Sequence, residues 1–269
     1  MHRRRLRLLR AACERGVSAA FREAWDVEGP EGGPAIVFAH GAVMTRAQWR
    51  PQVEQLAKAG YRCITIDLPG HGALAEQAFT LDGASDLVAE AIDREAGGRA
   101  VLVGLSLGGY VSMAVAGRSP GRVRGLVLAG STREPAGPFR FVFSLVALTL
   151  GLVPESILRR TIEWWYRRRY GRHVADTILA NGYYARGGSV AIRQLHGGRF
   201  RERLLAYGGP VLVINGHLDL VMRLGERRFI EGLPGVTTKV LQRAAHLSNV
   251  DRPGEFSAAV QTFIEGLEA

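Results

Sequence analysis

Cysteine is scarce in this chain, which has two such residues among 269. Cys63 lies in an apolar stretch that predicts a buried strand, and Cys13 lies in a basic N-terminal segment. Two cysteines so far apart form neither a disulfide framework nor the spacing of a metal site. Such sparse use of cysteine fits a reducing compartment. We therefore expect a cytoplasmic protein that needs no metal or other cofactor.

Long hydrophobic runs are also missing. The longest run, 141–153, has 13 residues, whereas a helix that crosses a bilayer needs about 20. The N-terminus is basic, but neither an apolar run of signal-peptide length nor a small-residue cleavage site follows it. We expect no stable membrane insertion.

Lysine is nearly absent, because 33 of the 35 basic residues are arginine, and the formal net charge is +10. Such a charge makes nucleic acid the first partner class to consider. The arginines are spread along the chain without a nucleic-acid-binding motif, so we expect no nucleic-acid partner. Residues 2–5 and 167–169 are denser in arginine. The second cluster lies among aromatic residues at 164–170, where we favour a solvated helix face over contact with an anionic membrane or an acidic substrate.

The chain does contain a pentapeptide of the form Gly-x-Ser-x-Gly, which is Gly104-Leu105-Ser106-Leu107-Gly108. It lies between an apolar run at 100–103 and a stretch with helical spacing at 110–116. Strand, tight turn and helix are the context of a nucleophile elbow, which exposes a strained serine at the positive end of the next helix. The glycines leave room where a side chain would collide with the neighbouring strand and helix. A chance match among 34 glycines is the alternative, and the flanking strand and helix favour the elbow.

Strand and helix patterns alternate on both sides of this motif. Continuous apolar runs suit parallel strands that are buried on both faces. Alternating strands and helices predict a parallel sheet with helices on both faces, whose sites lie beyond the carboxyl ends of the strands. Strands are predicted at 17–27, 35–39, 61–66, 100–103, 122–129, 210–214 and 237–241, with helices at 46–59, 81–95 and 253–267.

The alternation stops between residues 131 and 209, where only helical patterns remain. We interpret 131–209 as a helical cap or lid, inserted into an α/β core that consists of 17–130 and 210–269. Residues 1–16 are predicted to be a basic N-terminal helix or appendage. The clearest helical stretches in the cap are 140–152, 155–169 and 174–179.

Several motifs in a fixed order make the chain resemble the α/β-hydrolase fold family. They are His40-Gly41, the loop Asp-Leu-Pro-Gly-His-Gly at 67–72, the elbow around Ser106, Asp219 after a late strand, and His246 in the segment 244–249. The order serine, acid, histidine is the order of that family. The resemblance implies a doubly wound, mostly parallel α/β sheet with an inserted helical cap.

The resemblance also implies a catalytic triad of Ser106, His246 and Asp219. A serine hydroxyl needs a general base, and histidine is the natural base near neutral pH. His246 is the candidate among seven histidines because it follows the last strand, where its ring reaches the rim. Asp219 would fix its tautomer. Structural roles are expected for His40 and Asp67, and His71 is expected to be structural or solvent-exposed. His217 lies two residues before Asp219 and could contact the site, but we favour a role in packing its loop.

Two backbone N–H groups are expected to form the oxyanion hole, one from Leu107 and one from Ala42. Apolar residues follow the acid and the oxyanion loop, and the cap is rich in aromatic residues, which favours an apolar acyl or leaving group. The candidate pocket residues are Val43, Trp49, Phe143 and Val221.

These features predict a carboxylesterase that acts on moderately apolar, small-molecule esters through an acyl-enzyme. Other reactions of the same triad stay open: C–C bond hydrolysis, lactone or thioester hydrolysis, and acyl transfer. A ligand-binding regulatory protein with slow turnover is a further alternative. We expect a monomer or a homodimer.

Overall fold

The computed structural model of the chain describes residues 23–137 and 139–267. The predicted N-terminal helix or appendage at 1–16, the beginning of the first predicted strand at 17, and Cys13 all lie outside the described residues.

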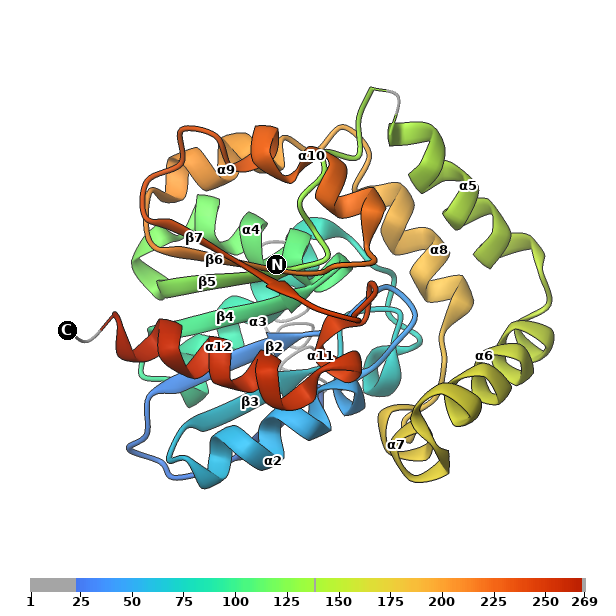
Figure 1. Cartoon of the computed structure of the whole chain (residues 1–269), viewed down its shortest axis with the longest axis horizontal. Helices are drawn as coiled ribbons and strands as arrows, with labels where there is room; N and C mark the ends of the chain where they lie inside the picture. Colours follow the sequence, from blue (N-terminus) through green and yellow to red (C-terminus); the bar gives the residue numbers. More distant parts are fainter. Residues whose placement is uncertain (1–22, 138, 268–269) are drawn as a thin grey trace, which may run out of the picture.

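Seven strands form one sheet in the order β1-β3-β2-β4-β5-β6-β7 (Figure 1). Every pair is parallel except β1 with β3. This confirms the predicted doubly wound, mostly parallel α/β sheet. The strands are β1 (Trp25–Glu28), β2 (Ala35–Ala39), β3 (Arg62–Ile66), β4 (Ala100–Leu105), β5 (Val123–Ala129), β6 (Val211–Gly216) and β7 (Val236–Leu241).

Alternate residues of the five inner strands, β2 to β6, face two separate apolar layers, which is why these strands read as nearly continuous hydrophobic runs. In β2, Val37 packs into one layer, whereas Ile36 and Phe38 pack into the other. The first layer is closed by helices α3 (Leu81–Glu95), α4 (Leu107–Arg118), α9 (Phe200–Tyr207) and α10 (Leu220–Ile230), and the second by α2 (Arg50–Lys58) and α12 (Pro253–Glu265).

The predicted helix at 46–59 is divided in the structure. A short 3-10 helix, η1 (Arg46–Trp49), precedes α2, which begins at Arg50 with Pro51 in its first turn. Proline is favoured there because its missing N–H has no intrahelical acceptor at that position. Two further short 3-10 helices are η2 (Gly72–Leu74) and η3 (Pro120–Arg122), and α11 (Ser248–Asp251) precedes α12.

Helices also fill the segment predicted to be a cap, beyond the carboxyl ends of the strands (Figure 1). Three match predicted stretches: α5 (Phe139–Leu152), α6 (Glu155–Tyr170) and α7 (Arg172–Ile178). The sequence had not marked α8 (Ala185–Gln194), which contains two glycines, nor α9. Because α9 packs on helix α4, the helices that cover the rim are α5 to α8, and these four helices are called the cap below.

The described residues contain no single helix that is both long and apolar enough to cross a membrane. Within 23–137 and 139–267, one pair of consecutive helices, α5 and α6, has the necessary length and composition together, and the chain bends by 109° between them.

Candidate active site

Ser106 joins β4 to α4 in a strained conformation. Its φ of 53° is positive, as is that of one other non-glycine residue in the described chain, Arg243. Its N–H donates to Ala129 O at 2.8 Å, which ties the turn to β5. A Cβ on Gly104 would collide with the backbone of Gly108, and one on Gly108 would collide with Ala39 O. The structure thus has the strand, tight turn and helix expected around Ser106, with glycines where a Cβ would collide.

His246 and Asp219 form a hydrogen-bonded pair at the same rim. The distance from His246 Nδ1 to Asp219 Oδ2 is 2.7 Å. The carboxylate is buried, whereas the imidazole side chain is 42% exposed. Asp219 follows β6, and its loop is joined to the His246 loop by a bond from Leu218 N–H to Ala244 O at 2.8 Å. The pair leaves Nε2 of the ring free of Asp219, as a general base requires.

Gly130, which the sequence analysis did not single out, lies against this pair. It follows β5 with a φ of +56°, and a Cβ placed there would be 2.8 Å from His246 Cε1 and 3.0 Å from Nδ1. Its N–H donates to Asn215 Oδ1 at 2.9 Å, and the Asn215 amide donates to Thr132 Oγ1 at 3.0 Å. Asn215 is fully buried and holds this close turn in place.

The loop after β2 carries the predicted oxyanion donor, Ala42. Gly41 N–H donates to Gln48 Oε1 at 3.1 Å, and Ala42 O lies 2.6 Å from His71 Nε2. Between them, Gly41 O accepts from Met44 N–H at 3.1 Å. These contacts fix the peptide groups on both sides of Ala42. The Leu107 N–H opens helix α4 and has no intrahelical acceptor. Neither the Ala42 nor the Leu107 N–H donates to a backbone acceptor in the described ranges.

His40, His71 and Asp67 are structural, as expected for His40 and Asp67, and His71 is buried rather than solvent-exposed. His40 Nε2 accepts from Leu68 N–H at 2.9 Å, and burial keeps the pKa of His40 well below 6.5. Burial also lowers the pKa of His71. Asp67 accepts from Arg46 N–H at 2.8 Å and Ala73 N–H at 3.0 Å, while burial raises the pKa of Asp67.

A buried amide network lies behind the oxyanion loop and connects it to the segment after His246. Gln48, whose oxygen accepts from Gly41, donates from Nε2 to Asn249 Oδ1 at 3.3 Å. Gln52 Nε2 donates to Asn249 O at 2.8 Å, and Asn249 Nδ2 donates to Gln52 Oε1 at 3.1 Å. All three amide side chains are fully buried. The two halves of the site thus share one rigid support.

A buried carboxylate, Asp251, joins the His246 loop to the cap. Its Oδ2 accepts from Ala245 N–H at 2.7 Å. Its Oδ1 accepts from Arg169 Nε at 3.0 Å and from Tyr170 Oη at 3.2 Å, both at the end of α6. The loop that carries the candidate base is therefore attached to a cap helix.

A cavity of about 330 Å³ contains Ser106, Asp219 and His246 in its wall. Of the predicted site residues, Ala42, Leu107, Phe143 and Val221 line it as well. Its remaining walls are mostly apolar and come from the core and from the cap. They are Tyr110, Val142, Val146, Ile192, Leu195 and Met222.

Two predicted pocket residues do not line this cavity. The prediction for Trp49 is wrong: its ring is fully buried below the rim, with centroids 5.2 Å from Phe38 and 5.9 Å from Phe256. Val43 is partly buried and packs between the core and the cap cluster around Met44.

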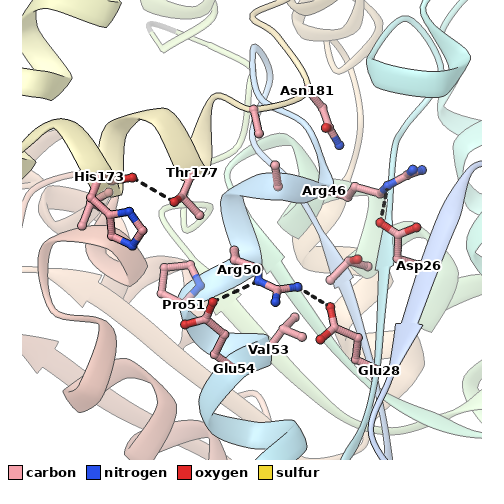
Figure 2. Close-up of a pocket in the computed structure, with 14 residues that line it drawn as sticks. Asp26, Glu28, Arg46, Arg50, Pro51, Val53, Glu54, His173, Thr177 and Asn181 are labelled. Carbon is pink, nitrogen blue, oxygen red and sulfur yellow. Dashed lines mark hydrogen bonds and ion pairs between the residues drawn. The ribbon is translucent and has the colours of Figure 1, made fainter.

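A second pocket, shown in Figure 2, lies between β1, α2 and α7 and is lined by charged side chains. These side chains are paired with one another. Arg46 contacts Asp26 at 2.7 Å, and Arg50 contacts Glu28 at 2.6 Å and Glu54 at 3.0 Å. No group of three or more His, Cys, Asp or Glu side chains among the described residues is placed to hold a metal ion.

Comparison with known proteins gives the same fold and names hydrolytic relatives. A pimeloyl-[acyl-carrier protein] methyl ester esterase from Nitrosomonas europaea is 37% identical over 86% of this chain and 95% of its own. A 3-oxoadipate enol-lactonase from Acinetobacter baylyi is 26% identical over 90% of this chain and 92% of its own. The structure of a thermophilic esterase from Thermogutta terrifontis matches with a TM-score of 0.75 at 23% identity, covering 91% of this chain and 94% of that one.

The model of the alpha/beta hydrolase family matches residues 36–259, which include the elbow, Asp219 and His246. That range begins in β2, ends in α12 and includes helices α5 to α8. The chain therefore belongs to the alpha/beta hydrolase family.

Proposed function

We propose that this hydrolase is a serine carboxylesterase that acts on moderately apolar esters. The observation that carries the proposal is the 2.7 Å bond between Asp219 and His246 in the wall of the apolar cavity that also contains Ser106. A buried acid, a partly exposed base and a strained serine in one cavity are the groups that acyl transfer needs.

In the first half of the reaction, Ser106 Oγ attacks the ester carbonyl carbon and His246 Nε2 takes the hydroxyl proton. The negative charge that develops on the carbonyl oxygen is accepted by the N–H groups of Ala42 and Leu107. Asp219 stabilises the imidazolium through Nδ1–H. Collapse of the tetrahedral intermediate breaks the bond to the alkoxy group, which leaves as the alcohol with the proton from His246.

In the second half, His246 removes a proton from water, which attacks the acyl-enzyme. A second tetrahedral intermediate forms in the same oxyanion hole. Its collapse breaks the bond to Ser106 Oγ, which takes the proton back from His246, and the carboxylic acid leaves. The ester and one water thus become one acid and one alcohol.

The apolar cavity wall supports an apolar acyl group. Val142, Phe143 and Val146 come from α5, and Ile192 and Leu195 come from α8 or directly follow it. An acyl chain that fills this space gains roughly 0.8 kcal/mol for each methylene removed from water.

A methyl ester of an acyl chain on a carrier protein is a second candidate substrate. It is favoured by the 37% identical relative, which is named for such a substrate, and by the arginines of α6 near the cap surface. The two candidates are distinguished by letting a soluble ester and the carrier-bound ester compete for the enzyme and comparing their kcat/KM values.

The test is a series of p-nitrophenyl esters from acetate to octanoate. We expect kcat/KM to rise with chain length until the cavity is filled, and Ser106→Ala to lose on the order of 10⁴-fold or more of kcat. Ser156→Ala, at an exposed serine of α6, is the matched control and should keep wild-type activity. A flat or falling series would contradict the apolar acyl pocket, and an active Ser106→Ala variant would contradict the mechanism.

A further inference from the structure

Helix α5 is apolar on both of its faces. Residues 141–154 contain no charged side chain. Phe143, Ala147 and Leu150 are buried against the rest of the protein. The opposite side carries four exposed residues at spacings of four, three and four, which place them on one face. This outer stripe of α5 consists of Phe141, Leu145, Leu148 and Leu152, with Phe141 and Leu152 each 72% exposed.

Helix α6, which follows α5 around the outer edge of the molecule (Figure 1), carries an exposed stripe of a different kind. It consists of four exposed residues at spacings of three or four, namely Ile157, Arg160, Trp164 and Arg168. Trp164 is 65% exposed. No carboxylate within residues 23–137 and 139–267 forms an ion pair with Arg160 or Arg168. These four residues are called the outer stripe of α6.

The charge of the chain is concentrated in the same region. Residues 139–194 contain nine arginines and three acidic residues, so this fifth of the chain carries more than half of the net charge of +10. A concentration of positive charge beside an apolar helix face matches an anionic, amphipathic surface.

Although the sequence alone favoured a solvated helix face at 164–170, the adjoining apolar stripe of α5 changes that interpretation, and we propose that the outer stripes of α5 and α6 dock the protein peripherally on an anionic lipid surface. The apolar stripe of α5 would enter the boundary between headgroups and acyl chains, where Trp164 also fits, while Arg160 and Arg168 contact lipid phosphates. A spanning mode is disfavoured because α5 has 14 residues and the chain bends by 109° before α6. An acidic protein partner would satisfy the arginines but would need its own matching apolar face for the stripe of α5.

The docking surface adjoins the candidate active site. Val142 and Val146, on the flank of α5 between its outer stripe and its buried face, line the catalytic cavity. An amphiphilic ester in the outer lipid layer would therefore lie close to the cavity mouth. This inference concerns the surface alone and is independent of the reaction at Ser106.

Cosedimentation with vesicles tests the proposal. The vesicles are pure phosphatidylcholine, or phosphatidylcholine with about one quarter phosphatidylglycerol. Leu148→Asp is compared with Leu205→Asp, since the two leucines are 49% and 44% exposed and Leu205 lies on α9, away from the stripes. The double variant Arg160→Glu/Arg168→Glu is compared with the double variant Arg99→Glu/Arg227→Glu. The second makes an equal charge change at exposed arginines elsewhere.

We expect the wild type to bind anionic vesicles at least about tenfold more tightly than neutral ones, with the preference falling as salt is added. Leu148→Asp should lose about tenfold of its vesicle affinity, and the Arg160/Arg168 variant should lose the anionic preference. Both controls should bind like the wild type, and all variants should hydrolyse a short soluble ester at the wild-type rate, which shows that they fold.

Absence of wild-type binding to anionic vesicles would overturn the proposal. Equal losses in the control variants would also overturn it, because binding would then follow total charge. Binding of an acidic acyl carrier protein without binding of vesicles would assign the surface to a protein partner instead.

Discussion

The rim of the sheet and the cap differ in how many of their side chains find partners within the protein. At the rim, the buried polar groups of Asn215, Gln48 and Asp219 all have partners at hydrogen-bond distance. In the cap, α5 leaves an apolar stripe in water, and α6 leaves two arginines without a carboxylate among the described residues. The hydrogen bonds at the rim therefore hold its side chains in fixed positions, whereas the exposed side chains of the outer cap surface do not contribute to packing.

The two regions meet at two contacts, one on each half of the candidate site. On one side, the glycines of α8 allow it to approach the oxyanion loop closely, with Gly188 against Ala42 O. On the other side, Asp251 holds the His246 loop and the end of α6. The comparison teaches that the cap supports the geometry of the candidate site through these two contacts, besides lining the cavity.

Gly130→Ala should have the largest effect among the changes that probe the rim. The new methyl group would lie within 3.0 Å of His246 and would displace its ring. A misplacement of about 1 Å costs on the order of 10²-fold in rate, which should appear in kcat/KM. Gly137→Ala is the matched control, since Gly137 has the same φ of +56° and open space around its Cβ position. Equal activity losses in the two variants would contradict a specific role for Gly130.

Gly188→Ala probes the contact between the cap and the oxyanion loop. Its Cβ would collide with Ala42 O, so either the loop or α8 must shift. We expect kcat to fall by about tenfold to a hundredfold, less than the 10²–10³-fold cost of losing one oxyanion donor. Gly254→Ala in α12, where a Cβ meets nothing within 4 Å, should leave kcat unchanged. A fully active Gly188→Ala enzyme would show that the cap does not support the loop.

Asp251→Asn probes the contact between the cap and the His246 loop. The amide keeps the size of the side chain but places an N–H₂ group toward either Arg169 or Ala245 N–H. We expect kcat to fall roughly tenfold with little change in KM, and the free energy of unfolding to fall by about 1–3 kcal/mol. Asp176→Asn, which removes an exposed ion pair with Arg167 in the cap, should change neither. A change in KM alone would assign Asp251 to substrate binding rather than to positioning.

Acid should lower the free energy of unfolding through the buried imidazole of His40, and this effect should be smallest at neutral pH. Because the pKa of buried His40 lies well below 6.5, the unfolded chain binds a proton below about pH 6.5 that the folded chain does not. The free energy of unfolding should therefore fall with decreasing pH below 6.5, by up to about 1.4 kcal/mol per pH unit for this ring. Asp67, whose raised pKa acts with the opposite sign, reduces the slope at lower pH.

Urea unfolding between pH 7.5 and 5.5 measures this slope, and NMR titration of the His40 ring identifies its source. A His40 ring that titrates near 6.5 in the folded protein would contradict the buried, neutral state.

The sequence predicted those parts of the site that follow strand ends in recognisable motifs. The elbow is local, since its glycines act within the same turn and on the adjacent strand. His246 and Asp219 each follow a strand of the predicted sheet, and parallel strands bring their carboxyl ends to one edge. The mostly parallel sheet and the position of Ser106 after a strand could therefore be predicted from pattern and resemblance, whereas the order of the strands was not predicted.

The supporting residues could not be predicted because their contacts join distant parts of the chain. Asn249 and Gln48 are 201 positions apart, and Asn215 and Gly130 are 85 apart. Gly130 is one of 34 glycines, and no motif in the sequence predicts its contact with His246. Trp49 was misassigned although its spacing with Val53 and Leu56 already favoured the buried helix face, where the structure places all three.

Labelling with a fluorophosphonate probe, followed by intact mass measurement, tests the central claim that Ser106 is activated by His246. The account predicts one adduct on the wild-type protein, located at Ser106, none on Ser106→Ala, and labelling of His246→Ala slowed by about 10³-fold or more. A folded wild type that stays unlabelled, or a Ser106→Ala variant that labels at the wild-type rate, would contradict it.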